Sequence, residues 1–106
     1  MVLKRGDIVR VAEGKPRPAV VIQSDWLVTP DRILLCPLTS QLIDAPIYRP
    51  TLVPDKGNGL LAPSQMMVDQ IGAARRTRID GIIGHLSFDD RERLSASLAI
   101  VLRIAG

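Results

Sequence analysis

The chain has 106 residues, enough for one domain with a modest hydrophobic core, and we expect a single domain spanning residues 1–106. Aromatic residues make up only 3% of the sequence, which argues against the nucleic-acid modules that stack bases on several exposed rings. The formal net charge of +3 is mildly basic and compatible with a polyanionic partner, and all but three of the 14 basic residues are arginines.

The first two-thirds of the chain are organised as short strands divided by turn residues. Alternating or β-branched segments predict strands over residues 7–11, 19–23, 32–38, 47–53 and 66–71, with one more inside 73–79. Gly14, Pro16 and Pro30 interrupt the pattern between strands, and "PDKGNG" at 54–59 is a strong turn signal. Pro50 indicates that the 47–53 segment is an edge or bulged strand.

The end of the chain changes to helical periodicity. Ser87 followed by Asp90 is a capping pair, since the hydroxyl accepts from first-turn amides and acidic residues favour a helix N-terminus. One apolar stripe follows at helical spacing, formed by Leu94, Leu98, Val101 and Leu102 with Ala105 beyond. We therefore expect a helix over about 88–103, lying against a mainly β fold. Many short strands with one terminal helix predict a strongly curved antiparallel sheet or barrel.

Several classes of protein are excluded or disfavoured by what the sequence lacks. It contains no P-loop, dinucleotide fingerprint or zinc-ligand spacing, so we expect neither a metal nor another cofactor. His85 is the only histidine, which excludes a two-histidine ribonuclease mechanism and favours a surface or capping role. Cys36 is the only cysteine, in an apolar run, and is expected to be buried filler in a reducing compartment. With no membrane-length apolar segment and no secretion signal, a cytoplasmic protein without a membrane partner is expected.

Two strand ends carry the candidate site. Arg17 lies between Pro16 and Pro18, which fix the backbone, so its guanidinium starts from a defined point. Thr39 and Ser40 follow the apolar strand at 32–38. We expect the two ends to meet and to bind a phosphate, because preorganised arginine and hydroxyl donors stabilise extra negative charge on phosphoryl oxygens. The same residues also fit a solvated loop arginine and an ordinary turn.

Arg75, Arg76 and Arg78 form a second basic feature in "ARRTR". On a strand Arg76 and Arg78 would share one face and Arg75 would occupy the other. The cluster could bind a nucleic-acid backbone, and a solvated strand edge protected by charge is equally consistent with it.

Five motifs in order resemble the MazF/PemK toxins, metal-independent and ribosome-independent endoribonucleases, or mRNA interferases, of bacterial toxin–antitoxin pairs. The motifs cover nearly the whole chain: "RGDIVRV" (5–11), "RPAVVIQSD" (17–25), "PLTS" (37–40), "VDQI" (68–71) and "IGHLS" (83–87). The resemblance implies an SH3-like β-barrel with a C-terminal helix, working as a homodimer whose grooves admit single-stranded RNA. It also implies a cognate antitoxin, for which we expect an acidic, partly disordered tail.

The resemblance assigns roles to single residues. The catalytic arginine of the family falls on Arg17 and its threonine on Thr39, with Ser40 as an adjacent phosphate contact. Asp69 and Gln70 match its "DQ" motif and are expected to support the RNA groove. The implied reaction is attack of a ribose 2′-hydroxyl on its own phosphate, giving 2′,3′-cyclic phosphate and 5′-hydroxyl ends. A guanidinium is essentially never deprotonated, so Arg17 fits a charge-stabilising clamp or an acid for the leaving group, and Glu13 is a candidate base.

Two other functions remain open from the sequence. Residues 20–42 also resemble the CcdB toxins, which have the same fold, poison DNA gyrase and cleave nothing. That family contacts gyrase through a Trp near the C-terminus, whereas the only tryptophan here is Trp26 and the chain ends "VLRIAG". A basic-surfaced barrel acting as an adaptor is the third alternative.

Overall fold

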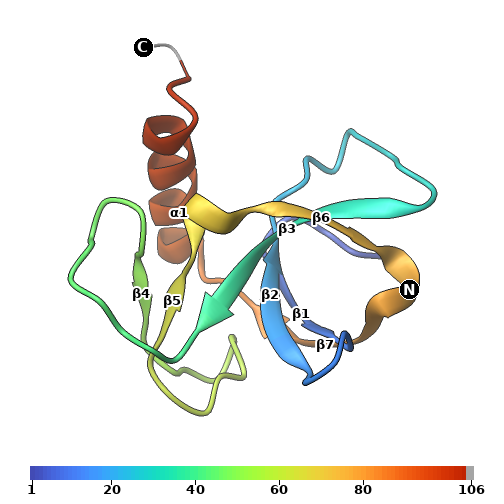
Figure 1. Cartoon of the computed structure of the whole chain (residues 1–106), viewed down its shortest axis with the longest axis horizontal. Coiled ribbons are helices and arrows are strands. Elements are labelled where there is room, and N and C mark those ends of the chain that lie inside the picture. The colour runs from blue at the N-terminus through green and yellow to red at the C-terminus, as the bar shows by residue number, and fades with distance from the viewer. Residues whose placement is uncertain (105–106) are drawn as a thin grey trace.

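The computed structural model describes residues 1–104 and is a strongly curved antiparallel sheet with one C-terminal helix (Figure 1). The strands are β1 (Asp7–Val11), β2 (Arg17–Val21), β3 (Arg32–Thr39), β4 (Thr51–Leu52), β5 (Ser64–Met66), β6 (Gly72–Arg75) and β7 (Ile79–His85). Two 3₁₀ turns, η1 (Val68–Gln70) and η2 (Arg76–Arg78), flank β6, and the helix is α1 (Phe88–Val101). The mainly β fold with a curved antiparallel sheet and a terminal helix is thus confirmed.

The long strand β3 joins two parts of the sheet. Its first half pairs with β6, from Arg32 opposite Arg75 to Leu35 opposite Gly72, while its end pairs with β5 through Leu38 and Thr39. The strand order is β4-β5-β3-β2-β1-β7, so β6, β3, β2, β1 and β7 curl round on one side and β5 and β4 branch off on the other (Figure 1). η2 leads from the end of β6 into β7 and closes the curl.

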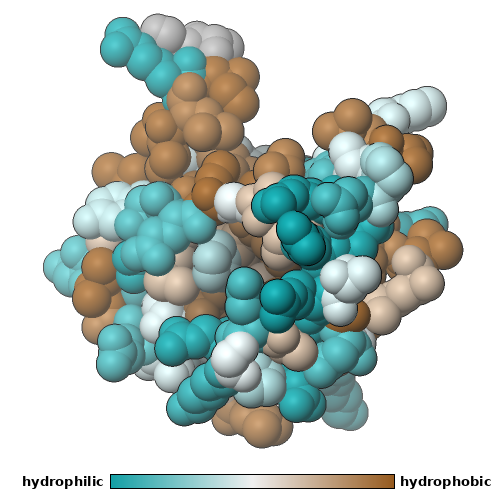
Figure 2. Space-filling view, turned by 45° about the vertical axis from the view of Figure 1, so that its right-hand side comes forward, coloured by the Kyte–Doolittle hydropathy of each residue, from teal (hydrophilic) through white to brown (hydrophobic). Residues whose placement is uncertain are grey.

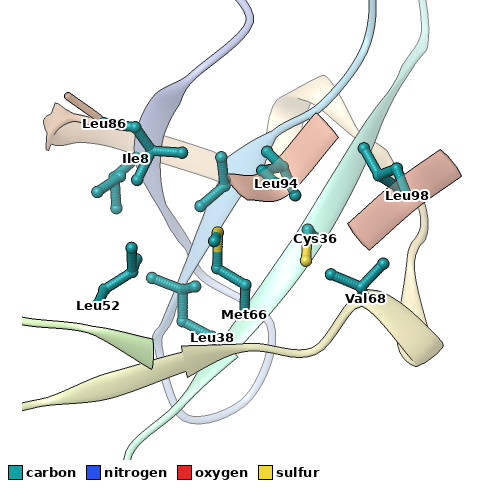
Figure 3. Packing of buried hydrophobic residues seen from close by; sticks show 10 residues of the cluster. Ile8, Cys36, Leu38, Leu52, Met66, Val68, Leu86, Leu94 and Leu98 are labelled. Atoms are coloured by element: carbon teal, nitrogen blue, oxygen red, sulfur yellow. The ribbon is translucent and has the colours of Figure 1, made fainter. Parts of the chain in front are cut away.

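Alternation along the strands directs side chains into two hydrophobic cores. The core inside the curl contains Val9, Ala19, Val21, Ile33, Leu35 and Ile79. The core beneath α1 contains Ile8, Val20, Cys36, Leu38, Leu52, Met66, Val68, Leu86, Leu94 and Leu98 (Figure 3). Adjacent residues of β2 and β3 therefore belong to different cores, as expected for strands that are buried on both faces.

The helix begins where the capping pair predicts. The Ser87 hydroxyl accepts from the Asp90 backbone N–H at 3.1 Å, and α1 runs from Phe88 to Val101. Leu94 and Leu98 of the expected stripe are buried, whereas Val101 and Leu102 are exposed, because α1 projects past the sheet at its C-terminal end (Figure 1). Ala105 lies outside the described residues.

The strands expected over 7–11 and 32–38 are confirmed, the latter reaching Thr39. The strand expected over 19–23 starts at Arg17 and ends at Val21, because the buried Gln23 side chain binds the following loop through the carbonyl of Leu27 at 2.8 Å. Within the 47–53 segment only β4, Thr51–Leu52, is a strand, and it lies at the edge of the sheet, as Pro50 predicted.

One expectation for the second half of the chain is wrong. Residues 66–71 are not one strand, because β5 ends at Met66 and η1 follows. The strand expected inside 73–79 is confirmed as β6, which ends at Arg75 where η2 begins. β7 was not predicted, because it contains two glycines and lacks clean alternation. Within residues 1–104, no helix is both long and apolar enough to pass through a lipid bilayer.

Gly84 of β7 is closely approached by the turn at residues 53–60. Asn58, which is fully buried, holds that turn by donating to the Val53 carbonyl at 2.9 Å. A Cβ on Gly84 would lie 2.5 Å from backbone atoms of Gly57 and Asn58, whereas a Cβ on Gly81 of the same strand would meet nothing within 4 Å. Of the two glycines of β7, only Gly84 is therefore required by packing.

We expect Gly84→Ala to lower the free energy of unfolding by about 1–3 kcal/mol, because backbone must move to admit the methyl group. Gly81→Ala is the matched control and should change stability by less than about 0.5 kcal/mol. Urea denaturation followed by circular dichroism measures both. Equal stability of the two variants would contradict the described packing of this turn.

Cys36 offers a test of the core beneath α1. Burial, with a smaller effect from the nearby Asp69 carboxylate, raises the pKa of its thiol to about 12. At pH 8 only about one thiol in ten thousand is then ionised, and the thiolate is the reactive form. We expect iodoacetamide at pH 8 to leave the folded protein unmodified and to alkylate it fully in guanidinium chloride, as measured by mass spectrometry. Complete labelling of the folded protein would show that this core is open.

Candidate active site

The β1–β2 hairpin positions Arg17. It is the first residue of β2 and pairs with Val11, the last residue of β1. Between them the loop turns through Gly14, whose φ of +66° is a conformation that glycine adopts without strain. With Pro16 and Pro18 on either side, the backbone of Arg17 is fixed while its side chain is exposed.

The register of β2 and β3 brings Arg17 and Thr39 together. Ala19 pairs with Pro37, and continuing the antiparallel register by two residues places Arg17 opposite Thr39. Residues directly opposite each other on adjacent antiparallel strands have Cβ atoms about 5 Å apart and share a face. The two strand ends that the sequence analysis paired therefore meet on one side of the sheet.

A pocket of ≈ 360 Å³, here called the Thr39 pocket, lies between these strand ends. It is lined by Lys15, Pro16, Arg17, Pro18, Leu38, Thr39, Ser40, Gln41 and Ser64. The lining includes two cationic side chains and no carboxylate, so the pocket is suited to binding an anion. The Thr39 hydroxyl oxygen accepts from the Gln41 backbone N–H at 3.1 Å, which leaves its own proton free to be donated.

A second pocket of ≈ 270 Å³, here called the Gln70 pocket, opens into the curl of the sheet. It is lined by Val11, Glu13, Lys15, Arg17, Pro18, Ala19, Leu35, Pro37, Gln70, Gly72, Ala73 and Ala74. Lys15, Arg17 and Pro18 line both pockets. Arg17 consequently stands between a pocket with hydroxyl donors and a pocket that contains Glu13 and Gln70.

Asp69 is engaged by another side chain of the chain itself. The Arg49 guanidinium donates to its two carboxylate oxygens at 2.7 and 3.2 Å, a bidentate ion pair between η1 and the β3–β4 loop. Hydrogen bonding from Arg49, with a minor contribution from the neighbouring Gln70 amide, holds the pKa of Asp69 below its usual value. The two residues of the "DQ" motif thus have different surroundings, since Gln70 lines a pocket and Asp69 is paired.

The three arginines of "ARRTR" line neither pocket. The strand expected to place Arg76 and Arg78 on one face is wrong, because both lie in the 3₁₀ turn η2. Arg76 donates through Nε to the Thr29 carbonyl at 2.7 Å and braces the β2–β3 loop. Arg75 is the exposed last residue of β6 and lies opposite Arg32, the first residue of β3. The Arg78 carbonyl accepts from the Ala12 backbone N–H at the base of the Arg17 hairpin.

His85 also lies away from the two pockets. Its Nδ1 is 2.6 Å from an oxygen of the nearly buried Asp7 carboxylate, across the β1–β7 ladder. The imidazole is exposed, as the surface alternative expected, and it joins two strands instead of capping the helix. Within residues 1–104, no group of three or more His, Cys, Asp or Glu side chains is placed to hold a metal ion.

Four residues around the two pockets were not predicted from the sequence. Lys15 lies in the hairpin loop directly before Pro16 and could have been found there, and Gln41 follows directly after Ser40. No local sequence pattern identifies Ser64 or Arg49. Ser64 reaches the Thr39 pocket through the pairing of β5 with β3, and Arg49 is placed by an ion pair with Asp69, 20 residues later in the chain.

Comparison with known proteins identifies the family of the chain. Residues 4–102 match the family described as PemK-like, MazF-like toxin of type II toxin–antitoxin system. The probable endoribonuclease MazF of Mycolicibacterium smegmatis is 32% identical over 98% of this chain and 100% of that protein.

Solved structures agree in fold. The MazE–MazF complex of Deinococcus radiodurans has a TM-score of 0.78 at 21% identity, covering 98% of this chain and 99% of that one. An endoribonuclease bound to its cognate antitoxin, from a mycobacterial species, has a TM-score of 0.83 at 15% identity, covering 97% of each chain. The chain belongs to the PemK-like and MazF-like toxin family of type II toxin–antitoxin systems.

Proposed function

We propose that this toxin is an endoribonuclease that cleaves single-stranded RNA at specific sequences without a metal ion. One observation carries the proposal: Arg17 and Thr39, which face each other when the β2–β3 register is continued beyond Ala19 and Pro37, line one pocket that has two cations and no carboxylate. Such a pocket attracts a phosphodiester, and it holds charged and hydroxyl donors on rigid strand ends.

The reaction that fits this pocket is transesterification. The ribose 2′-hydroxyl attacks the adjacent phosphorus, the bond to the 5′-oxygen of the next nucleotide breaks, and a 2′,3′-cyclic phosphate and a 5′-hydroxyl end form. Negative charge accumulates on the non-bridging oxygens during this step. The Arg17 guanidinium and the Thr39 and Ser40 hydroxyls stabilise it as preorganised donors. DNA is spared because it lacks the nucleophile.

Glu13 is the proposed base in this scheme. Its carboxylate lines the Gln70 pocket together with Arg17. A carboxylate can accept the 2′-hydroxyl proton, and the departing 5′-oxygen takes a proton from water to become the 5′-hydroxyl. The guanidinium stays charged throughout and acts as the clamp. Lys15, which lines both pockets, adds positive charge beside the same phosphate.

The rest of the RNA is proposed to follow the surface around the hairpin. Gln70 contacts RNA from its pocket, while Asp69 supports that region through Arg49. Arg75 and Arg78 are exposed and available for backbone phosphates, and Arg76 has one donor committed to the β2–β3 loop.

We also propose a homodimer and a cognate antitoxin with an acidic tail as partners. The C-terminal end of α1 and the residues directly after it form a projection that is largely brown in Figure 2, and Ile100, Leu102 and Ile104 are all more than half exposed. Such a surface suits association with another protein. The similar structures from D. radiodurans and a mycobacterial species include toxin–antitoxin complexes.

The first prediction concerns the chemistry. We expect the purified protein to cut single-stranded RNA in the presence of EDTA, leaving ends that polynucleotide kinase labels without prior phosphatase treatment. The same sequence made as DNA should stay intact. Loss of cutting in EDTA, or equal cutting of DNA, would overturn the proposed mechanism. A gyrase supercoiling assay should show no effect, and stalled gyrase–DNA complexes would instead favour the CcdB alternative.

The second prediction concerns the two facing residues. Arg17→Ala should lower the cleavage rate by at least about 100-fold and Thr39→Val by about 10²–10³-fold, the usual loss for one donor to a transition-state anion. Arg32→Ala is the control, because Arg32 is an exposed arginine at the opposite end of β3 that lines neither pocket. Its rate should equal that of the wild type. An active Arg17→Ala variant would remove Arg17 from the site.

A further inference from the structure

The Gln70 pocket lies directly beside the proposed phosphate site, because Arg17 lines both pockets. The 360 Å³ Thr39 pocket is used by the proposed cleavage reaction, but the smaller pocket is not, apart from Glu13. Its volume of ≈ 270 Å³ is just below the roughly 300 Å³ at which sites for whole small-molecule ligands begin. A part of a nucleotide would fit it.

The walls of this pocket suit a flat, uncharged group. Most lining residues are apolar: Val11, Pro18, Ala19, Leu35, Pro37, Ala73 and Ala74. The polar groups are few and come from Glu13, Lys15, Arg17 and Gln70. A nucleobase has this character, with two apolar faces and a hydrogen-bonding edge. Since the lining contains no aromatic ring, the guanidinium plane of Arg17 is the surface on which a base can stack.

Gln70 is held in place from two directions. The 3₁₀ turn η1 is anchored at its start, where Met67 N–H donates to the Pro37 carbonyl at 2.8 Å, and by Val68, which is fully buried. Directly after Gln70 the chain enters β6, whose Gly72 pairs with Leu35 of β3. The backbone of Gln70 is therefore fixed to the same strand that carries Thr39.

A separate interaction, the Arg49–Asp69 ion pair, determines the orientation of the Gln70 amide. An amide offers N–H donors on one side and a carbonyl acceptor on the other, and a half-turn exchanges them. Asp69 accepts both hydrogen bonds of Arg49, and an ionised carboxylate can only accept. The side chain of Arg49 is 12% exposed and that of Asp69 is 35% exposed, so the pair is partly shielded from water. Hydrogen bonding from Arg49 and, to a smaller extent, from the Gln70 amide lowers the pKa of Asp69. Because the carboxylate can only accept, the amide N–H groups are on its side and the carbonyl is left for the pocket.

We propose that the Gln70 pocket receives one RNA base next to the cleaved phosphate, that Gln70 reads it, and that the Arg49–Asp69 pair sets the amide orientation. This inference rests on the proposed endoribonuclease function. With its carbonyl directed to the pocket as an acceptor, Gln70 selects a base that presents an N–H donor on its edge. Asp69 is a positioning residue here and does not touch RNA.

The test is the cleavage profile on an RNA pool with randomised positions, read by sequencing the new 5′ ends. Gln70→Leu removes the proposed reader, and Asp69→Asn replaces the acceptor-only carboxylate by an amide of nearly the same shape. Each should weaken discrimination at one and the same position beside the cut by roughly two- to tenfold, the scale of one hydrogen bond. Asp89→Asn, an exposed carboxylate of the first turn of α1, is the control and should keep the wild-type profile.

The double variant Asp69→Asn/Gln70→Leu separates positioning from mere structural support. If Asp69 acts through Gln70, the double variant has the profile of Gln70→Leu alone, with no added change in base preference. Thermal melting by circular dichroism shows that each variant is folded. A wild-type profile in Gln70→Leu, or a further shift on adding Asp69→Asn, overturns this inference while leaving the nuclease intact. Absence of cutting by the wild type overturns the proposed function itself.

Discussion

The pairing of β2 with β3 is the interaction on which the site depends. Val20 and Cys36 point into the core beneath α1, whereas Ala19 and Leu35 point into the core inside the curl. A slip of one residue would exchange these faces for the whole strand. It would also turn Arg17 away from the side of the sheet that holds Thr39. Two aliphatic cores that are buried on opposite faces of the same strands therefore fix the position of an exposed guanidinium.

Pro37 shows how a strand buried on both faces accommodates a residue without an N–H group. β3 pairs with β6 up to Leu35 and with β5 from Leu38, so Pro37 lies where one neighbour has ended and the next is beginning. Its carbonyl still accepts from Met67, which anchors η1. The proline thus marks the point at which the sheet divides, and both pockets open beside it: Pro37 lines one and Leu38 the other.

How much of this could be read from the sequence depends on the range of the interactions involved. The strand before the hairpin, β3 and the start of α1 follow from local alternation and from Ser87 as a cap, and the "RP" and "TS" dipeptides mark the strand ends. β7 was not predicted, because Gly84 interrupts its strand pattern. That glycine is required by close contact with a turn more than 20 residues earlier, which no local pattern indicates. The Arg49–Asp69 pair is invisible for the same reason. Arg76 was misplaced because a 3₁₀ turn closes the curl where periodicity suggested a strand.

One arginine between two pockets has a consequence for how recognition and reaction are linked in the proposed enzyme. A phosphate is attacked efficiently only when its oxygens lie close to their intended donors, so small displacements cost rate. If the base beside it does not enter the Gln70 pocket, the ribose and phosphate are held differently and the Thr39 side receives the anion poorly. Lys15, Arg17 and Pro18 form the wall that the two pockets share. Binding of the base in one pocket and binding of the phosphate in the other therefore depend on each other. Sequence preference in such a nuclease would be expressed in the rate of cleavage as well as in the affinity for RNA, since the residue that stacks on the base also stabilises the charge.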